Sequence, residues 1–359
     1  MPANPQFAPI AALVLLAAGA AQGQAPTPVA APATIVTQPV YATVETAAVA
    51  SAEDAADDPA IWRNPANPGA SLIVATDKQA GLYVYGLDGK TRSLLAAGKV
   101  NNVDLRDGVA LGAQRDAVLV GASNRTDLTQ GKIALFRLDT DKATLAPLAD
   151  LPVAAGEAYG FCFWRRAADR AMFAFLIMKD GAIVQAQLDL TGPTPTAKVV
   201  RTVKLATQSE GCVADDRTGM VYVAEEDVGV WSMPADPASL APPKAFARVD
   251  NVHLFADAEG LAIAPEGGHG GHLIVSSQGD SAYSAYRLTD GVFTGRFKVA
   301  KGTLGDTSDT DGIEVALGDF GNAFPQGLFI AQDGDNAPNA QNFKLVPWQQ
   351  VRDALGLGR

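Results

Sequence analysis

Short apolar runs alternate with Gly, Asn and Asp along nearly the whole chain. Examples are Leu72–Thr76, Ala117–Gly121 and Met220–Ala224, which have the length and residue types of β-strands. The chain also contains 35 Gly and 22 Pro, which supply many turns. Only the C-terminal segment Trp348–Leu357 has a helical pattern. The sequence therefore predicts an all-β fold with one C-terminal helix.

The strand pattern repeats, because six segments each open with acidic or polar residues and continue into an apolar run. These openings are Asp57–Trp62, Asn102–Arg106, Glu157–Phe163, Ser209–Val213, Asp257–Ile263 and Asp309–Val315. Counted from Asp58, Asp104, Gly160, Gly211, Gly260 and Gly312, the steps are 46, 56, 51, 49 and 52 residues. A period of about 50 residues with three or four strands per unit is typical of β-propellers. We predict a six-bladed β-propeller with four- to five-stranded antiparallel blades.

Two further strand-like segments, Thr34–Thr37 and Val40–Val44, precede the first opening, whereas the last unit is incomplete after Gln332. We expect these N-terminal strands to complete the last blade, because that arrangement would leave no open sheet edge.

The N-terminus has the pattern of a secretory signal peptide. Phe7–Ala21 consists mainly of small and apolar residues and ends in Ala18–Ala21. It is shorter than a typical membrane-spanning helix. No Lys or Arg precedes it, so the initiator amine supplies the only positive charge there. We predict a signal peptide over residues 1–25, a flexible Ala/Pro/Thr-rich lead-in over 26–36, and a single propeller domain over 37–359. The protein would then be secreted or periplasmic.

The two cysteines, Cys162 and Cys212, both lie in apolar strand-like runs. An exported chain could pair them, but that setting favours buried free thiols over a disulfide.

The formal net charge of −11 argues against a nucleic-acid partner, which would require a basic face. It suits a protein that binds metal cations, although solubility alone also accounts for it. The sequence gives no indication of a membrane partner or of oligomer formation, so we expect a monomer.

Acidic residues at the repeated openings are the candidate chemistry. The first strand of each propeller blade lines the central channel, so acids at the starts of these strands converge. The converging carboxylates would be Asp57, Asp58, Glu210, Asp257, Glu259, Asp309 and Asp311. So many carboxylates cannot all remain ionised in a low-dielectric site without cations, and oxygen ligands at this density favour calcium. A local turn or capping role for each Asp is the alternative, but recurrence over four repeats favours metal.

Three cations occupy matching places in successive repeats. Lys78, Arg125 and Lys179 each follow a second strand. Three cations in register beside a metal cluster predict a substrate with several anionic groups, because Arg and Lys bind phosphate oxygens well.

Other known catalytic and binding motifs do not fit the sequence. Gly89–Thr91 resembles the end of a P-loop, but Val84 stands where a Gly is required. Thr307–Gly318 departs from the EF-hand pattern at both its first and its last position. The sequence does not support a Ser-His-Asp catalytic triad. Metal-assisted chemistry or binding without catalysis remains.

The chain resembles the β-propeller phytases, the alkaline calcium-dependent phytase family. The motifs that carry the resemblance are Asp54–Trp62, Asn101–Arg106, Ala122–Arg125, Tyr159–Phe161, Ser209–Gly211, Ala224–Asp227, Asp257–Gly260, Ser276–Gly279, Thr307–Gly312, Ala331–Gly334 and Asn342–Trp348. They occur in the family's order over nearly the whole mature chain.

The resemblance implies removal of phosphate from myo-inositol hexakisphosphate (phytate) by attack of a calcium-bound water, with several calcium ions at one end of the channel. The implied calcium or water ligands are Asp58, Glu210, Glu226, Asp257, Glu259 and Gln278. Lys78, Arg125, Tyr159 and Lys179 would hold substrate phosphates and, with Glu210, form the catalytic set. The chain departs from the family where a second Lys is expected, at Gln79, and where an Asp aligns with Gly305, next to Asp306.

Two other functions are compatible with a calcium propeller, because fold does not fix function. One is a non-catalytic protein that docks a polyanion or another protein. The other is a different calcium propeller hydrolase, such as a lactonase. The three cations favour the phytase interpretation, because a lactonase has no use for them.

Overall fold

The computed structural model describes residues 1–3 and 35–357. The chain separates into two units, Met1–Thr34 and Ile35–Arg359, and the fold described below is that of the second unit. All but the first three residues of the expected signal peptide, and most of the expected lead-in, lie outside the described residues.

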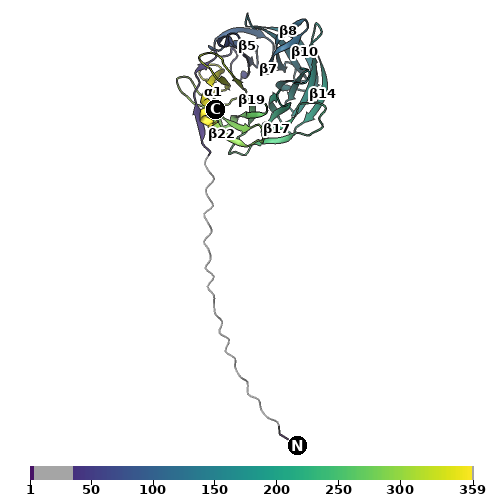
Figure 1. Cartoon of the computed structure of the whole chain (residues 1–359), viewed down its shortest axis with the longest axis vertical. Helices are drawn as coiled ribbons and strands as arrows, with labels where there is room; N and C mark the ends of the chain where they lie inside the picture. The colour runs from purple at the N-terminus through teal and green to yellow at the C-terminus, as the bar shows by residue number, and fades with distance from the viewer. Residues whose placement is uncertain (4–34, 358–359) are drawn as a thin grey trace. The chain divides into compact units, whose positions relative to one another are not determined.

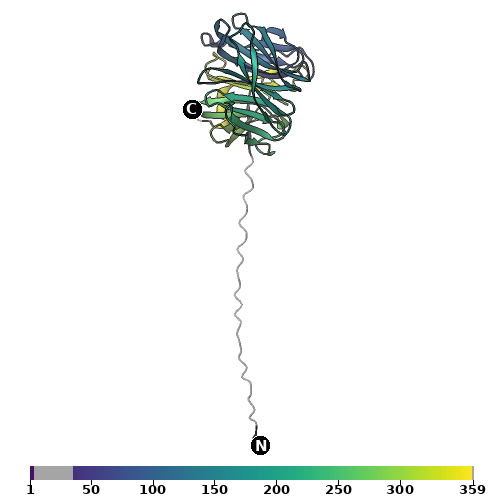
Figure 2. The ribbon, with the colours of Figure 1, turned by 90° about the vertical axis from the view of Figure 1, so that its right-hand side faces the viewer.

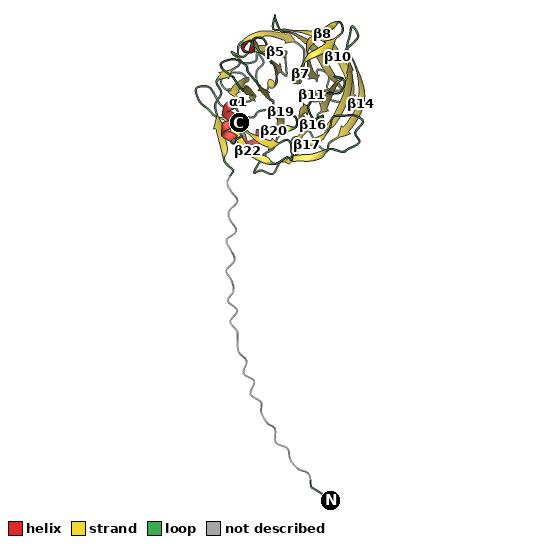
Figure 3. Cartoon of the chain, viewed as in Figure 1, coloured by secondary structure: helices red, strands yellow, loops and turns green. Residues whose placement is uncertain are grey.

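Six small sheets surround a common axis (Figure 1), as Figure 3 shows by secondary structure. Blade 1 contains β3 (Ala56–Trp62), β4 (Leu72–Asp77), β5 (Gly81–Gly86) and β6 (Thr91–Ala96). Blade 2 contains β7 (Val100–Leu111), β8 (Gln114–Asn124), β9 (Gln130–Asp139) and β10 (Thr144–Ala155). Blade 3 contains β11 (Ala158–Arg165), β12 (Met172–Met178), β13 (Ala182–Asp189) and β14 (Thr196–Lys204).

Blade 4 contains β15 (Ser209–Asp215), β16 (Met220–Glu225), β17 (Gly229–Pro234) and β18 (Lys244–Arg248). Blade 5 contains β19 (Ala258–Glu266), β20 (Gly270–Ser277), β21 (Ala282–Arg287), β22 (Phe293–Val299) and β1 (Thr37–Val40). Blade 6 contains β23 (Ile313–Leu317), β24 (Gly327–Asp333), β25 (Asn342–Pro347) and β2 (Val44–Glu45). The predicted six-bladed propeller is confirmed, and Figure 2 shows the blades from the side.

The N-terminal strands close the ring in a different way from the one expected. Strand β2 pairs with β25 and completes the last blade, as predicted. Strand β1, however, pairs in parallel with β22 and so adds a fifth strand to blade 5. The prediction that both strands complete the last blade is therefore wrong for β1. One short segment thus covers the outer edges of two neighbouring blades, which removes two open edges instead of one.

The apolar core lies between neighbouring blades. Each of the six apolar clusters combines residues of two adjacent sheets, such as Val84 of blade 1 with Val120 of blade 2. Strands buried on both faces need apolar residues at successive positions, which explains runs such as Met172–Met178.

One helix, α1 (Trp348–Leu355), follows β25 and packs against β1, β22 and β24. Two short 3₁₀ turns, η1 (Pro68–Ala70) and η2 (Gln278–Asp280), complete the secondary structure of the described residues. None of the helices in this part of the chain has the length and apolar character needed to span a membrane.

Cys162 and Cys212 form a disulfide, so the prediction of free thiols is wrong. Cys162 lies on β11 and Cys212 on β15, the innermost strands of neighbouring blades, and their Cα atoms are 5.5 Å apart. Strand burial alone suggested two isolated thiols. The repeat brings them together, because their separation of 50 residues is about one blade.

Candidate functional site

A ring of six residues stands at the start of the innermost strands. We call it the inner ring; its members are Asp57, Asn101, Tyr159, Glu210, Glu259 and Asp311. In blades 1 to 5 these residues lie in β-bulges, where the pairing of the first and second strands skips two positions. In blade 6, Asp311 lies two residues before β23 begins. Bulges redirect side chains, and in blades 1 to 5 they place the same position of each blade in this ring.

The bulges correct the alignment of the second opening. The repeat was counted from Asp104, but the residues that match Asp57-Asp58 are Asn101-Asn102. Asp104 lies deeper, where Arg106 Nη1 is 2.7 Å from Asp104 Oδ1. Strand β7 is 12 residues long and carries further register shifts, so counting between acidic residues displaced the alignment.

Glycines let the innermost strands approach one another at this ring. A Cβ at Gly160 would overlap the carbonyl oxygen of Glu210, and one at Gly211 would overlap that of Glu259. Gly260 and Gly312 meet the next blade's backbone in the same way, and their amides donate to the carbonyl oxygens of Asp311 and Asp57. The recurrent acid–glycine pairs therefore have a structural cause.

An outer ring consists of the residue that follows each second strand. Its members are Lys78, Arg125, Lys179, Glu226, Gln278 and Gly334. In all six blades the backbone amide of this residue donates to a carbonyl oxygen just before the inner ring, over 2.6 to 3.1 Å. The predicted register of the three cations is therefore confirmed. The outer ring is cationic over blades 1 to 3, and carries a carboxylate at blade 4 and an amide side chain at blade 5.

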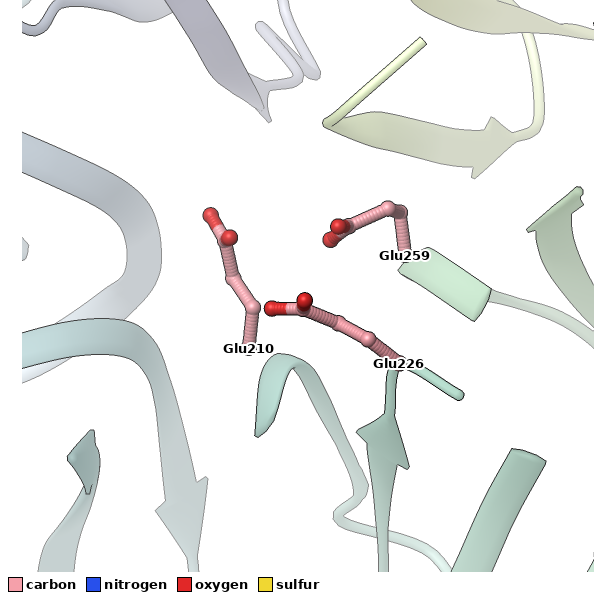
Figure 4. Close-up of side chains that lie close together, drawn as sticks. All are labelled: Glu210, Glu226 and Glu259. Carbon is pink, nitrogen blue, oxygen red and sulfur yellow. The ribbon is translucent and has the colours of Figure 1, made fainter. Parts of the chain in front are cut away.

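Three glutamates form the densest part of the site. One carboxylate oxygen each from Glu210, Glu226 and Glu259 lies within 4.8 Å of the others, and all three side chains are buried. Figure 4 shows the three carboxylates turned toward one another. Burial, then Asp57 and Asp311, raise the pKa of Glu210 well above its ordinary value. Burial, then Glu210 and Asp311, do the same to the pKa of Glu259.

This donor set fits a cation. Among the described residues, buried Oδ1 of Asp57, Oδ1 of Asn101, Oε1 of Glu226 and Oε2 of Glu259 accept no hydrogen bond. Burial of an acceptor atom without a hydrogen-bond donor costs free energy. A set of metal ligands that are all oxygen atoms suits calcium. Glu226 Oε2 accepts from Gln208 Nε2 over 2.8 Å, and Glu210 Oε1 accepts from Asn101 Nδ2 over 2.6 Å. These bonds orient the two carboxylates.

Lys78 is held by three carboxylates. Its Nζ lies 2.6 Å from Asp54 Oδ1, 3.2 Å from Asp57 Oδ2 and 2.9 Å from Asp311 Oδ2. Burial alone would lower the pKa of Lys78, but these acids raise it, so the ammonium stays charged. Asp311 Oδ1 also accepts from Gln278 Nε2 over 2.7 Å, and burial, then the charge of Asp57, raise the pKa of Asp311 to about 7.

Arg125 and Lys179 flank the ring of Tyr159. The Arg125 Cζ atom lies 5.7 Å and the Lys179 Nζ atom 5.0 Å from the ring centroid. Both side chains are partly exposed. Burial, then Glu210 and Glu259, raise the pKa of the Tyr159 hydroxyl, which keeps it neutral. Two cations and a hydroxyl thus border the acid cluster on the side of blades 2 and 3.

Two expected site residues, Asp58 and Asp309, lie elsewhere, and Asp257 lies at the margin of the site. Asp58 lines the channel, a cavity of about 260 Å³, and its Oδ2 accepts from the amide of Val103 over 3.0 Å. Asp257 is half-buried and lies near Glu226. Burial raises the pKa of Glu226, and the charge of Asp257 raises it further. Asp309 is exposed and packs beside Gly334. The structure therefore brings together Asp57, Glu210, Glu226, Glu259, Gln278 and Asp311, but not Asp58 or Asp309.

Sequence reasoning missed Asn101 and Glu157. Asn101 is the inner-ring member of blade 2, and Glu157 is the one carboxylate within 4 Å of Arg125 and Lys179 among the described residues. Asn101 and Asn102 stand at the start of β7 as Asp57 and Asp58 do at the start of β3, so comparing all polar residues at these strand starts, instead of acids alone, would have found Asn101.

Comparison with known proteins identifies the family of the chain. The model of the phytase family matches residues 7–358. The 3-phytase of Bacillus subtilis (strain 168) is 39% identical over 330 residues, which cover 88% of this chain and 85% of that protein. The chain belongs to the phytase family.

Membership in that family makes the protein an enzyme, so the expectation of a phytase is confirmed over the non-catalytic and lactonase alternatives. In this phytase both rings lie at the same end of the channel, where the acid cluster is next to the cations of blades 1 to 3.

Proposed function

We propose that this phytase is a calcium-dependent phosphomonoesterase that hydrolyses phytate, presented as its calcium complex, to lower inositol phosphates. The observation that carries the proposal is that a cluster of carboxylates and a pair of cations lie next to each other at one end of the channel. Glu210, Glu226 and Glu259 form an acid cluster within 4.8 Å, and Arg125 and Lys179 flank Tyr159 beside it. An enzyme of net charge −11 needs such local cations to accept a polyphosphate.

The calcium ligands we propose are Glu210, Glu226, Glu259, Asp57 and Asp311, with Gln278 and Asp257 at the margin. Asp57, Glu226 and Glu259 each have a buried carboxylate oxygen without a hydrogen-bond donor. Glu210 belongs to the same cluster of three glutamates, and the charge of Asp311 raises the pKa of both Glu210 and Glu259. Asp58 and Asp309 are weaker candidates, because Asp58 faces the channel and Asp309 is exposed. Bound calcium would offset the charge of the reacting phosphate and lower the pKa of a nearby water.

The chain's own residues would bind and orient the substrate. Arg125 and Lys179 offer guanidinium and ammonium donors to phosphate oxygens, and the neutral Tyr159 hydroxyl offers another donor. Lys78 is 7% exposed and surrounded by three carboxylates, so we assign it to compensating the acid cluster as much as to holding phosphate. Gln79 donates to the backbone of Ala52 and Asp54, so it contributes no positive charge to the substrate.

The test is phosphate release from phytate, measured with calcium and with a chelator. We expect release with calcium, loss of it with the chelator, and recovery when calcium is restored. Glu226→Gln should raise the calcium concentration needed for half-maximal rate by about tenfold or more, because it removes a charged ligand. Glu266→Gln is the matched control, since Glu266 is exposed at the far end of β19. Release that survives the chelator would refute calcium dependence.

We further propose export, with residues 1–25 as a cleaved signal peptide and residues 37–359 as one domain. The apolar pattern of Phe7–Ala21 and the compact unit Ile35–Arg359 support this. N-terminal sequencing of the exported protein should begin at about residue 26, and protein that retains Met1 outside the cell would contradict the proposal.

A further inference from the structure

Glu157 stands between the two cations of the proposed phosphate pocket. It follows Gly156, whose φ of 101° turns the chain into β11 and whose amide donates to Thr129 O over 2.9 Å. The carbonyl oxygen of Glu157 accepts from the Lys179 amide over 3.1 Å. The backbone on both sides is thus fixed, and the side chain is 23% exposed at the site.

The Glu157 carboxylate shares one oxygen between both cations. Oε1 lies 3.7 Å from Arg125 Nη1 and 3.8 Å from Lys179 Nζ. Both separations exceed hydrogen-bonding distance, so the N–H donors of the two cations are not used by Glu157. Among the described residues, neither cation has another carboxylate within ion-pair distance.

This geometry differs from an ordinary structural ion pair. In the pair of Arg166 with Asp169, for comparison, Arg166 Nη2 lies 2.7 Å from one carboxylate oxygen and Nε lies 2.9 Å from the other. Those two donors are occupied by the carboxylate. A carboxylate that lowers the local positive charge without occupying the donors, as Glu157 does, leaves them for another anion.

We propose that Glu157 is a specificity-determining residue whose charge opposes the binding of phosphate to Arg125 and Lys179 and so limits the affinity of this pocket. The inference rests on the proposed function, in which these cations hold phosphate. A phosphate group that approaches both cations also approaches the Glu157 carboxylate, and like charges at short range repel. Glu157 therefore weakens the binding of substrate and of released phosphate alike, which favours product release. It lowers the affinity of the pocket less for singly charged anions than for phosphate dianions.

The experiment measures binding of inorganic phosphate to the whole protein by ³¹P NMR titration in calcium-free buffer with chelator. Glu157→Gln keeps the size of the side chain and its backbone bonds but removes the charge. We expect phosphate to bind about tenfold more tightly, which corresponds to about 1.4 kcal/mol. The KM for phytate should fall in parallel, with kcat changing less than KM.

Asp127→Asn is the matched control, because Asp127 lies in the turn after Arg125 and its Oδ1 is engaged by the Thr129 amide and hydroxyl. It removes the same charge from the same end of the propeller. Glu157→Ala serves as a second variant and should tighten phosphate in the same direction.

Tighter phosphate binding by the Glu157 variants and not by Asp127→Asn supports the inference. Unchanged or weaker binding overturns it, and so does an equal gain in the control, which would indicate a general charge effect. A large fall in kcat with unchanged phosphate affinity also overturns it, because Glu157 would then act on the reaction itself. Failure of the wild-type protein to hydrolyse phytate would refute the proposed function, whereas the phosphate titration would still test Glu157.

Discussion

The ammonium of Lys78 lies 2.9 Å from Oδ2 of Asp311, and the two residues are 233 positions apart. Lys78 follows the second strand of blade 1, whereas Asp311 precedes the first strand of blade 6. This contact, together with the bond from the Gly312 amide to Asp57 O, joins the first and last blades at the site. Closure of the ring and assembly of the acid cluster are therefore linked.

Lys78→Met should destabilise the calcium-free protein. The change removes the cation shared by Asp54, Asp57 and Asp311 and leaves buried carboxylates without compensation. Loss of one partner from a buried pair costs about 3 kcal/mol or more. We expect this loss in urea unfolding with chelator, and a smaller loss with calcium, because a bound cation would supply the missing charge.

Lys90→Met is the control for that measurement. Its side chain is 77% exposed and its ammonium lies 3.8 Å from Asp88 Oδ2, so its loss should change stability by less than about 0.5 kcal/mol. Equal destabilisation of the Lys78 variant with and without calcium would mean that no cation replaces the ammonium.

Glu314 should make stability fall as pH rises. Burial, then the charge of Asp104, raise its pKa to about 8, against an ordinary value of 4.5. Between these two values the folded protein keeps a proton that the unfolded chain has lost, so the free energy of unfolding decreases toward pH 8. The slope from this group is at most about 1.4 kcal/mol per pH unit.

Glu314→Gln should flatten that slope, since the amide does not titrate. Unfolding of both proteins in urea at several pH values from 5 to 9 measures the difference. Parallel curves for variant and wild type would show that Glu314 titrates normally.

Gly211→Ala should destabilise the fold and disturb the acid cluster. The new Cβ would overlap the Glu259 carbonyl oxygen, so the innermost strands of blades 4 and 5 would have to separate. Overpacking of this kind costs about 1–3 kcal/mol. Gly268→Ala is the control, because no atom lies within 4 Å of its Cβ position. A lower melting temperature for both variants alike would contradict the close-approach explanation.

The repeat was predictable because each blade needs the same acid or polar opening, bulge and buried strands. The positions of Lys78, Arg125 and Lys179 followed from that repeat. The position of Asp58 did not, because adjacent residues in a bulge can point in different directions. Asp57 joins the ring and Asp58 faces the channel, and the sequence contains both as equal carboxylates. Asn101 was missed for a related reason, since a search for acids passes over an amide that donates to one of them.

The disulfide between Cys162 and Cys212 should contribute substantially to stability. It closes a loop of 50 residues and joins β11 to β15. Restriction of the unfolded chain by a loop of this length contributes about 4 kcal/mol. We therefore expect the double variant Cys162→Ser, Cys212→Ser to unfold at lower urea concentration and lower temperature than the oxidised wild type. Reductant should lower the stability of the wild type to that of the double variant and leave the variant itself unchanged, which separates loss of the bridge from effects of the serines.

Because Cys212 is two residues from Glu210, loss of the bridge should also weaken calcium binding, measured by titration calorimetry. Two titratable thiols in the unfolded, unreduced wild type would show that the bridge does not form and would restore the expectation of free thiols.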